Sequence, residues 1–469
     1  MINFSDLFKQ TSGHCYYSPD SSLLASSISF RLVIRDAKTL ETIHVWKCLD
    51  EINKISWSPD SSLILVILKK RNTLQIYNID DVTWKCKIDF AHVTVADAVW
   101  LSDSRHFMSI DELNVRIQLW SLISKSVSVL TGVKSIKRGV SILEDRVAVL
   151  ENKKAAKDDP NGLIDYCSIL QYNSKSHVWQ KLTQFKLPTK NATDINFTPD
   201  GTYLIIKDSP VHNRTVYVHD SISGKIKTKI SKINEVSNNF SLDHLFNSLP
   251  CTLHVCTPNL LAFGNLDNPE ISLVSKLSFK NLANLDHKEV VDKVNAAVYF
   301  EVARKAPVFN SEIDIITSGS NAAQAQPGIT GSKFEIADLP YHLPVDTSLS
   351  NSISWLRLSH NNEFLASQRS NMKRVVYIWG NLIDDNNSIK APHSIIETLE
   401  NIKCAAWSPK SNKLAICTGN DKIYLWSEES ILSIENPNDV RFGVVGLRWS
   451  GCGRYLILMS RTQMMICFV

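Results

Sequence analysis

The sequence has 469 residues, of which 44% are hydrophobic and 21% are charged, and 51 basic against 47 acidic side chains give a formal net charge of +4. This near balance gives no indication of nucleic-acid binding, and no apolar stretch reaches the roughly 18 residues that a membrane span needs. The N-terminus carries Asp6 and Lys9 and lacks the charged-then-apolar pattern of a secretion signal. We therefore expect a globular protein with no membrane and no nucleic-acid partner.

A short phrase recurs along the chain, and its best copies are Tyr17–Asp20, Trp57–Asp60, Phe197–Asp200 and Trp407–Lys410. Each copy has an aromatic residue, Ser or Thr, Pro and a polar residue, and an apolar run such as Leu63–Leu68 follows it. Neighbouring clear copies are about 40–43 residues apart, and a four-stranded WD-type blade has roughly 40–45. The period predicts a β-propeller.

A second mark supports this prediction, because each unit also contains a run that ends on an aromatic residue, as in Gln75–Tyr77, Gln118–Trp120 and Tyr424–Trp426. Apolar runs of about six residues, bounded by turn residues, favour buried strands over helices. Proline suits the turn between two strands, and large rings suit the packing between neighbouring sheets. We predict an all-β fold.

When degenerate copies are included, the turn phrase and the run that ends on an aromatic residue each occur nine times along the chain. Nine blades use about 380 residues and leave about 90 for insertions, whereas seven would leave about 170 unexplained. We predict one WD-type propeller over residues 1–469 with a single ring of nine blades. A ring of seven or eight blades with extra strands is the alternative.

The two ends of the chain predict how the ring closes. Met464–Val469 is a third-strand signal with no fourth strand after it, and Ile2–Lys9 alternates apolar and polar residues over part of its length. We expect the N-terminal segment to supply the missing outer strand, because this leaves no open sheet edge at the seam.

One segment, at about residues 287–351, lacks the blade motif. It contains Thr317–Gly328, whose composition indicates a flexible loop, between two strand-like stretches, Ala297–Val302 and Lys333–Ala337. We expect these stretches to pair. By its position the insertion links the outer strand of one blade to the inner strand of the next, on the narrower face of the ring. It is either a partner-docking element or a tolerated surface insertion.

We expect partner contacts on this narrower face of the ring. A basic cluster lies in the turn between a second and a third strand, and it could meet an acidic partner such as a tubulin tail or an acidic helix. The alternative is ordinary solvated loops. The candidate partner-binding residues are Lys69, Lys70, Arg71, Tyr299, Phe300, Lys333 and Phe334.

No catalytic motif is present: the sequence has no HExxH, GxSxG, P-loop or GxGxxG. Its ten cysteines include no CxxC pair, and its histidines are not spaced as a metal pair. We expect a protein that is not an enzyme, with no cofactor, no metal and reduced thiols. A hydrolytic site assembled at the central channel stays open as an alternative.

Several segments carry a resemblance: Asn3–Lys9, Arg31–Asp36, Trp84–Asp89, Lys333–Ala337 and Leu414–Gly419. Together they resemble the WD repeat protein eight family nearly end to end. The N-terminal block and Lys333–Ala337 are the more specific, because they lie outside the generic blade pattern.

The resemblance implies a non-enzymatic scaffold in the cytoplasm and cytoskeleton, at the spindle pole body or centrosome. It implies that the protein anchors microtubule minus ends together with a coiled-coil anchoring protein. In fungi it also implies a minus-end-directed kinesin, and γ-tubulin-containing pole material is a further expected partner. The alternative is an RNA- or ribosome-associated propeller resembling translation-initiation factors, which would need a basic stripe with stacking aromatic residues.

Overall fold

A computed structural model of the chain describes most of its residues. They are 3–11, 13–90, 94–111, 116–134, 139–154, 162–209, 215–230, 252–256, 260–264, 270–279, 281–291, 296–302, 333–380, 382, 391–435 and 442–469. In this part of the chain the elements are β-strands and one 3-10 turn, η1 (Lys69–Arg71), with no α-helix. The predicted all-β fold is confirmed.

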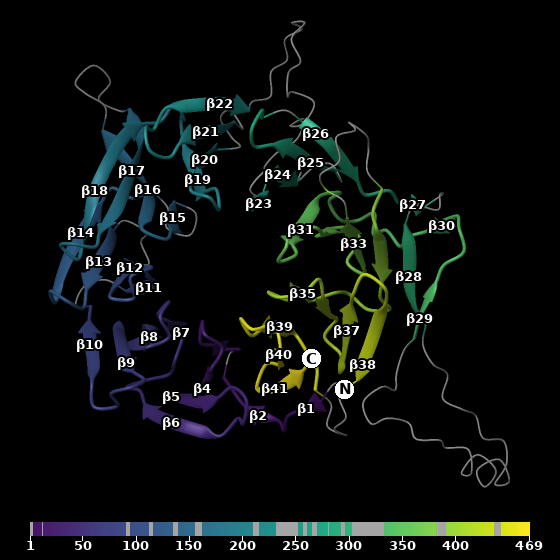
Figure 1. The fold of residues 1–469 in the computed structure, drawn as a ribbon, viewed down its shortest axis with the longest axis horizontal. Coiled ribbons are helices and arrows are strands. Elements are labelled where there is room, and N and C mark those ends of the chain that lie inside the picture. Colours follow the sequence, from purple (N-terminus) through teal and green to yellow (C-terminus); the bar gives the residue numbers. More distant parts are fainter. Residues whose placement is uncertain are drawn as a thin grey trace, which may run out of the picture.

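The strands form a ring of nine sheets around a central channel (Figure 1). We number these sheets as blades 1 to 9 in chain order, starting with β3. Within the described residues each blade contains a meander of antiparallel strands that runs from the channel outward. The predicted count of nine is confirmed, and the alternatives of seven or eight are not needed.

The first five blades follow one another without interruption. Their strands, from the channel outward, are β3 (Cys15–Tyr17), β4 (Leu23–Ile28), β5 (Arg31–Asp36) and β6 (Thr42–Lys47) in blade 1; β7 (Lys54–Trp57), β8 (Leu63–Leu68), β9 (Thr73–Asn78) and β10 (Lys85–Asp89) in blade 2; β11 (Val95–Trp100), β12 (His106–Asp111), β13 (Arg116–Ser121) and β14 (Ser126–Thr131) in blade 3; β15 (Val140–Leu143), β16 (Arg146–Lys154), β17 (Leu163–Asn173) and β18 (Val178–Lys186) in blade 4; and β19 (Ala192–Phe197), β20 (Tyr203–Asp208), β21 (Val216–Asp220) and β22 (Ile226–Ile230) in blade 5.

The last four blades include the additions to the basic pattern. Their own strands are β23 (Thr252–Cys256), β24 (Leu260–Gly264), β25 (Glu270–Ser275) and β26 (Asn281–Asp286) in blade 6; β31 (Ile353–Leu358), β32 (Leu365–Arg369), β33 (Val375–Trp379) and β34 (Ser394–Glu397) in blade 7; β35 (Cys404–Trp407), β36 (Leu414–Cys417), β37 (Lys422–Trp426) and β38 (Ile431–Glu435) in blade 8; and β39 (Gly446–Trp449), β40 (Tyr455–Met459) and β41 (Gln463–Phe468) in blade 9.

The core lies between successive blades. β8 is buried along its whole length because neighbouring blades cover both faces of its sheet. Ile64 and Val66 pack towards blade 1, whereas Leu65 and Ile67 pack towards blade 3. Burying such a side chain stabilises the fold by roughly 1.5–3 kcal/mol, which explains why the continuous apolar runs occupy middle strands.

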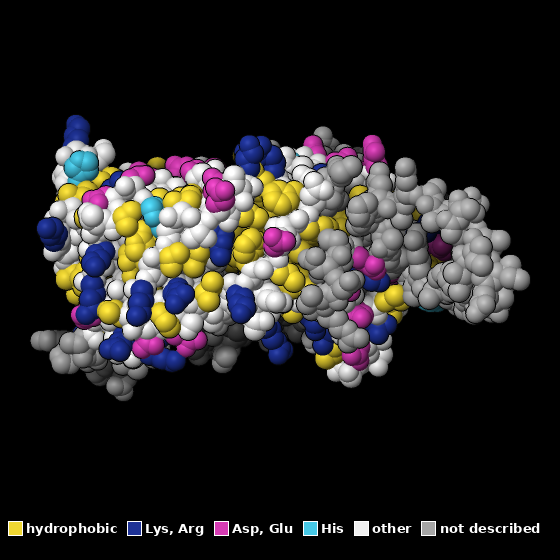
Figure 2. Space-filling view, turned by 90° about the horizontal axis from the view of Figure 1, so that it is seen from below, with side chains coloured by type: hydrophobic (Ala, Val, Ile, Leu, Met, Phe, Trp, Pro, Cys, Tyr) yellow, Lys and Arg dark blue, Asp and Glu magenta, His cyan; other side chains and the backbone are white. Residues whose placement is uncertain are grey.

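The outer strands are different, because one side of each faces solvent. β6 and β10 alternate exposed and half-buried residues, and lysines such as Lys47 and Lys87 are among the exposed ones. On the side of the ring that Figure 2 shows, Lys and Arg side chains lie among apolar ones along the coloured part of the outer wall. Charged outer strands protect a sheet edge against pairing with another chain.

The seam closes as predicted. β1 (Asn3–Phe4) and β2 (Phe8–Lys9) both pair antiparallel with β41, so the N-terminal segment is the outer strand of blade 9. Between them the backbone N–H of Ser5 donates to the Ile466 carbonyl at 2.9 Å. The two ends of the chain therefore meet in one blade (Figure 1).

The insertion differs from the expectation in its position. β28 (Ala297–Val302) pairs antiparallel with β29 (Lys333–Ile336), which confirms the predicted pairing. However, β28 also pairs parallel with β34, so both strands extend blade 7 outward and do not lie on the narrower face. The outer edge of β34 accepts β28 because apolar residues such as Val298 are buried there. β27 (Val290–Val291) and β30 (Tyr341–His342) form a separate short pair. The expected loop Thr317–Gly328 lies outside the described residues.

Candidate functional site

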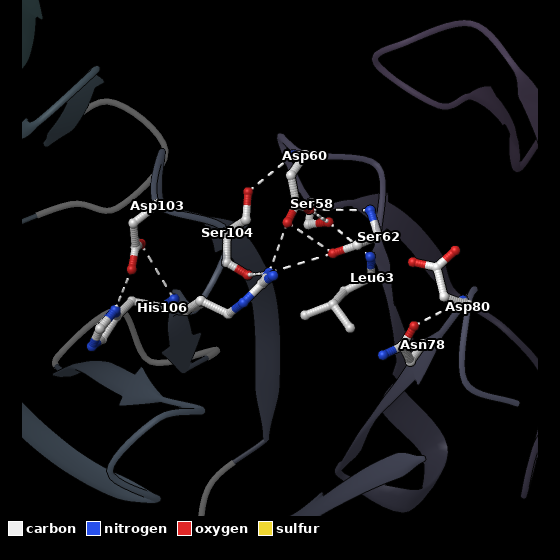
Figure 3. Close-up of polar contacts among 10 residues, drawn as sticks. Ser58, Asp60, Ser62, Leu63, Asn78, Asp80, Asp103, Ser104 and His106 are labelled. Atoms are coloured by element: carbon white, nitrogen blue, oxygen red, sulfur yellow. Dashed lines mark hydrogen bonds and ion pairs between the residues drawn. The ribbon is translucent and has the colours of Figure 1, made fainter. Parts of the chain in front are cut away.

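The Ser-Pro-Asp phrase forms the turn between the first and second strand of a blade. In blade 2 the Ser58 hydroxyl donates to the Asp60 carboxylate at 2.6 Å and accepts from the Leu63 N–H at 2.9 Å (Figure 3). Asp60 also accepts from the Ser62 hydroxyl at 2.8 Å. Ser61 completes the turn with a φ of 65°, in the left-handed region. The phrase is therefore a folding signal, because its polar atoms satisfy each other.

The same turns join neighbouring blades. The Asp60 N–H donates to the Ser104 hydroxyl of blade 3 at 3.0 Å, and Arg105 of blade 3 donates to the Asp60 carboxylate at 2.8 Å. Asp20 and Ser61 repeat the first of these bonds between blades 1 and 2 at 3.1 Å. Partial burial raises the pKa of Asp60, but the hydrogen bonds from serines and Arg105 outweigh it and hold that pKa at about 2.

Inner-strand tryptophans make a second set of links. The Trp57 indole N–H donates to the Tyr16 carbonyl of the preceding blade at 3.1 Å, and Trp100 donates to Ser56 at the same distance. Trp407 and Trp449 donate to the carbonyls of Arg357 and Ala406, both at 2.9 Å. In blades 2, 3, 8 and 9 the aromatic position of the repeat therefore fixes the inner strand against the blade before it.

Where the inner strands of blades 8, 9 and 1 meet, the surface is hollowed into a pocket of about 430 Å³. We call it the seam pocket. Gly451 allows the turns of blades 9 and 1 to approach closely there, because a Cβ at this position would lie 2.9 Å from the Ser21 hydroxyl oxygen. Aromatic rings, prolines and one guanidinium line it, among them Tyr16, Trp407, Pro409, Arg448 and Trp449.

The seam pocket was missed in the sequence because its walls come from both ends of the chain. Arg448 donates to the Cys15 carbonyl at 2.6 Å, and its guanidinium lies 3.8 Å from the centre of the Tyr16 ring. Aligning the nine repeats position by position reveals a signal for this pocket. Blade 8 has Lys410 and blade 9 has Cys452 at the position where blades 1 and 2 have Asp20 and Asp60.

The predicted basic cluster lies in η1, in the turn between β8 and β9 as expected. All three of its side chains are exposed. Lys70 forms an ion pair with Glu51 at 2.8 Å, and Arg71 forms one with Asp50 at 3.4 Å. These acidic partners offset much of the local positive charge. Binding of a partner by Lys69, Lys70 and Arg71 stays a prediction.

The other candidate residues lie in the insertion, where three aromatic rings pack against blades 7 and 8. Phe300 stacks on Tyr341 with ring centres 5.9 Å apart, and Phe334 meets Tyr424 of blade 8 edge-on at 5.4 Å. Tyr299 packs against the hydrophobic core between blades 7 and 8, which also includes Tyr424. Lys333 is exposed. The structure thus brings Tyr299, Phe300, Lys333 and Phe334 together on β28 and β29, and their role in partner binding stays a prediction.

Buried polar contacts attach the insertion. Glu301 is buried and accepts from the Tyr424 hydroxyl and from the Leu399 N–H, both at 2.9 Å. Where the insertion begins, the buried Arg369 guanidinium donates to the His287 carbonyl and to the Glu289 carboxylate, both at 2.9 Å. Sequence reasoning missed both anchors, because a single Glu or Arg in a strand carries no pattern.

The described residues contain no group of three or more His, Cys, Asp or Glu side chains placed to hold a metal ion. The same part of the chain contains no helix long and apolar enough to cross a membrane. Cys404 and Cys417 face each other across β35 and β36 as free thiols. A hydrogen bond from Cys417 lowers the pKa of Cys404, and the charges of Arg357 and Arg448 act in the same direction.

The repeated turns, the inner-strand tryptophans and the closed ring together define a WD-type β-propeller protein. No protein-family model matches the chain. Over 474 residues the chain is 29% identical to the WD repeat-containing protein WRAP73 of Mus musculus, and the match covers 100% of this chain and 96% of the mouse protein. This full-length similarity confirms the resemblance to a WD-repeat family that the sequence motifs indicate.

Solved structures of other propellers are similar at low sequence identity. The C-terminal WD40 domain of Sif2 matches with a TM-score of 0.49 and 11% identity, over 99% of this chain and 98% of that one. The Dos1 propeller matches with a TM-score of 0.48 and 12% identity, over 100% and 95% of the two chains.

Proposed function

We propose that this protein is a non-enzymatic scaffold that anchors microtubule minus ends at the spindle pole body or centrosome. It acts there with a coiled-coil anchoring protein and, in fungi, with a minus-end-directed kinesin and γ-tubulin-containing pole material. The full-length similarity to a WD-repeat protein carries the scaffold part of the proposal. The microtubule part rests on the family resemblance of the N-terminal block and of Lys333–Ala337.

The architecture supports a scaffold on physical grounds. A closed ring holds its surface loops in fixed positions, so a partner can bind without much ordering cost. Such a ring can offer a preformed groove to a peptide or a helix of a partner protein. The insertion adds a second surface on the outer side of blades 7 and 8, where β29 is the last strand of its sheet in the described residues.

The first experiment is imaging. We expect a fluorescently tagged full chain to form a focus at each spindle pole through mitosis, and we expect a coiled-coil protein to co-purify with it. A uniform cytoplasmic signal with no enrichment at the poles would contradict the proposal. RNA recovered in a salt-sensitive manner would instead favour the translation-associated alternative.

A second experiment removes the centre of the insertion. Val302 and Lys333 are paired residues, so a short Asn-Gly turn can join β28 to β29 when residues 303–332 are deleted. We expect the deletion to preserve the melting temperature and to abolish co-purification of the anchoring protein. Retained co-purification would assign partner binding to another surface.

A further inference from the structure

The repeat changes its charge at the seam pocket. Blades 1 and 2 carry Asp20 and Asp60 in their first turns, whereas blade 8 carries the exposed Lys410 next to Pro409 in the pocket wall. Blade 9 carries Cys452 at that position and the exposed Arg454 two residues later. The two basic departures from the repeat, Lys410 and Arg454, thus lie on adjacent turns, next to or near the pocket-lining residues Pro409 and Gly451.

Two arginines of inner strands add to this charge: Arg448 lies in the pocket wall, and Arg357 bonds to Ala405, the neighbour of the wall residue Ala406. Arg357 and Arg448 occupy equivalent positions in β31 and β39, each two residues before a turn serine. Arg357 donates to the Ala405 carbonyl, and Arg448 donates to the carbonyls of Gly13 and Cys15. Within the described residues neither guanidinium forms an ion pair with a carboxylate. Their hydrogen bonds hold both charges in place without neutralising them.

Two carboxylates lie on the neighbouring turns. The Asp20 carboxylate accepts from the Ser18 and Ser22 hydroxyls, the latter at 2.7 Å. Glu363 accepts from the side-chain amide of Asn412 at 2.9 Å. These neutral donors leave both carboxylates charged, but within the described residues neither carboxylate forms an ion pair with Lys410, Arg357 or Arg448. These three positive charges therefore stay available to an external anion.

The pocket walls are aromatic, and their own polar groups are used inside the fold. The indole N–H groups of Trp407 and Trp449 donate to backbone carbonyls of the preceding blade. What remains open to a ligand is ring surface, beside the guanidinium that covers Tyr16. Such a wall favours another ring, because aromatic pairs attract each other beyond the area that they bury.

The space itself depends on one small residue. Ala406 lies in the pocket wall between the positions of Arg357 and Arg448, where its two neighbouring blades carry arginine. A long side chain at position 406 would extend into the pocket, whereas alanine leaves it open.

We propose that the seam pocket binds a short acidic peptide of a partner protein, with one aromatic side chain seated among the rings and the flanking carboxylates facing Lys410, Arg357 and Arg448. The inference rests on the scaffold function proposed above and assigns a binding site to it. It places this contact at the turns between first and second strands, on the opposite side of the blades from η1. The favourable charge should also speed association, and this effect should weaken as salt is added.

The test uses the purified full chain and three fluorescent peptides of ten residues. The first has one central phenylalanine flanked by glutamates, the second has alanine at the centre, and the third has lysines in place of the glutamates. In fluorescence anisotropy we expect only the first peptide to bind well, with an affinity that falls as salt rises. No binding of the first peptide, or equal binding of all three, would overturn the proposal.

Variants with matched controls locate the site. Lys410→Asp restores the acidic turn of blades 1 and 2 and should weaken binding about tenfold, or about 1.4 kcal/mol, because it replaces an attraction for the peptide carboxylates by a repulsion. Its control is Lys175→Asp, the same charge change at an exposed residue of blade 4. Equal weakening by both variants would mean non-specific attraction and would overturn the proposal.

A second pair of variants separates space from charge. Ala406→Arg adds a positive charge but fills the pocket, so we expect it to abolish binding. Ser56→Arg, at the equivalent inner-strand position of blade 2, should leave binding unchanged. If Ala406→Arg strengthened binding, charge alone would explain the affinity and the pocket assignment would be wrong.

The peptide-binding experiment is independent of the imaging experiment. Pole localisation without peptide binding would overturn the pocket proposal, and peptide binding without pole localisation would overturn the microtubule-anchoring proposal.

Discussion

Blades 9 and 7 both carry strands beyond the repeat, and they hold them in different ways. Blade 9 is one strand short, and β1 and β2 complete it through antiparallel pairing with β41. Blade 7 already has four strands, and β28 extends it through parallel pairing with β34, a geometry absent from the other described pairs. The N-terminal addition pairs with the edge of β41, which the repeat leaves without a partner strand. The second is attached by the buried polar anchors Glu301 and Arg369.

This comparison separates two sources of stability. In blade 9 the backbone ladder and the packing of Phe4 and Leu7 against the core between blades 8 and 9 should dominate. In blade 7 a few side-chain contacts should dominate, because an insertion has no reserved position in the repeat. The predictions below test this difference, beginning with the largest effect.

Deleting residues 1–10 should cause the largest loss. It removes every pairing partner of β41 on its outer side and also Gln10, whose side-chain amide donates to the Ser460 carbonyl at 2.8 Å. We expect destabilisation by about 5 kcal/mol or more and aggregation through the exposed edge of β41. Thermal unfolding and light scattering measure both effects. A synthetic peptide of the deleted residues should restore solubility, and an unchanged melting temperature would contradict the role of the seam strand.

Arg369→Met should have the second-largest effect. The substitution keeps the length of the side chain but removes the donor that the guanidinium offers to the carbonyl of the buried His287 and to the exposed Glu289 carboxylate. We expect a loss of about 2–3 kcal/mol in the free energy of unfolding, typical of buried polar groups that lose a partner. The control is Lys373→Met, an exposed residue of the same hairpin. Equal unfolding curves for the two variants would show that the buried guanidinium does not anchor the insertion.

Phe334→Ala should have a smaller and local effect. The ring of Phe334 joins β29 to Tyr424 of blade 8, and its loss should cost about 1–3 kcal/mol. Amide hydrogen exchange should quicken in residues 333–336 and stay unchanged in β36 and β37. Ile336→Ala is the matched control on the same strand, because Ile336 is 67% exposed. Faster exchange throughout blade 8 would mean that the insertion supports that blade as a whole.

The smallest effect should be the response to acid of a turn carboxylate that blades 7 and 9 lack. They carry Asn361 and Cys452 where blade 2 carries Asp60. The folded-state pKa of Asp60 is about 2, below its ordinary value of 3.8, so its contribution to stability is present above pH 3.8 and is lost as the pH falls towards 2. Asp60→Asn should lower stability near neutral pH and reduce the further loss in acid. Urea unfolding at about pH 7 and about pH 3 measures this, with the exposed Asp6→Asn as control. An unchanged acid response would assign it to other carboxylates.

The sequence predicts the fold well where the physics is local and repeated. Runs such as Leu63–Leu68 identify middle strands, and the Ser-Pro-Asp phrase identifies turns because its hydrogen bonds form within six residues. The missing last strand and the alternating N-terminus even predict the closure. These features depend on the spacing of neighbours along the chain, which a single sequence contains.

Features that join distant segments were not predictable in the same way. The parallel pairing of β28 with β34 depends on which outer edge is vacant, and the local pattern of Ala297–Val302 is the same for either face. The seam pocket joins Tyr16 to Arg448, so its composition is visible only after the ring has closed. Its trace in the sequence is the replacement of the turn aspartate by Lys410 in blade 8 and by Cys452 in blade 9.

The pairing of the two chain ends sets an order of events during synthesis. Ser5 and Ile466, which bond across the seam, lie 461 positions apart. At about 5–20 residues per second the ribosome needs roughly 20–90 s to make that length. During this time the earlier blades form an open arc whose first apolar face has no neighbour. Final closure therefore waits until β41 has been synthesised, and a nascent-chain chaperone has a defined period in which to act.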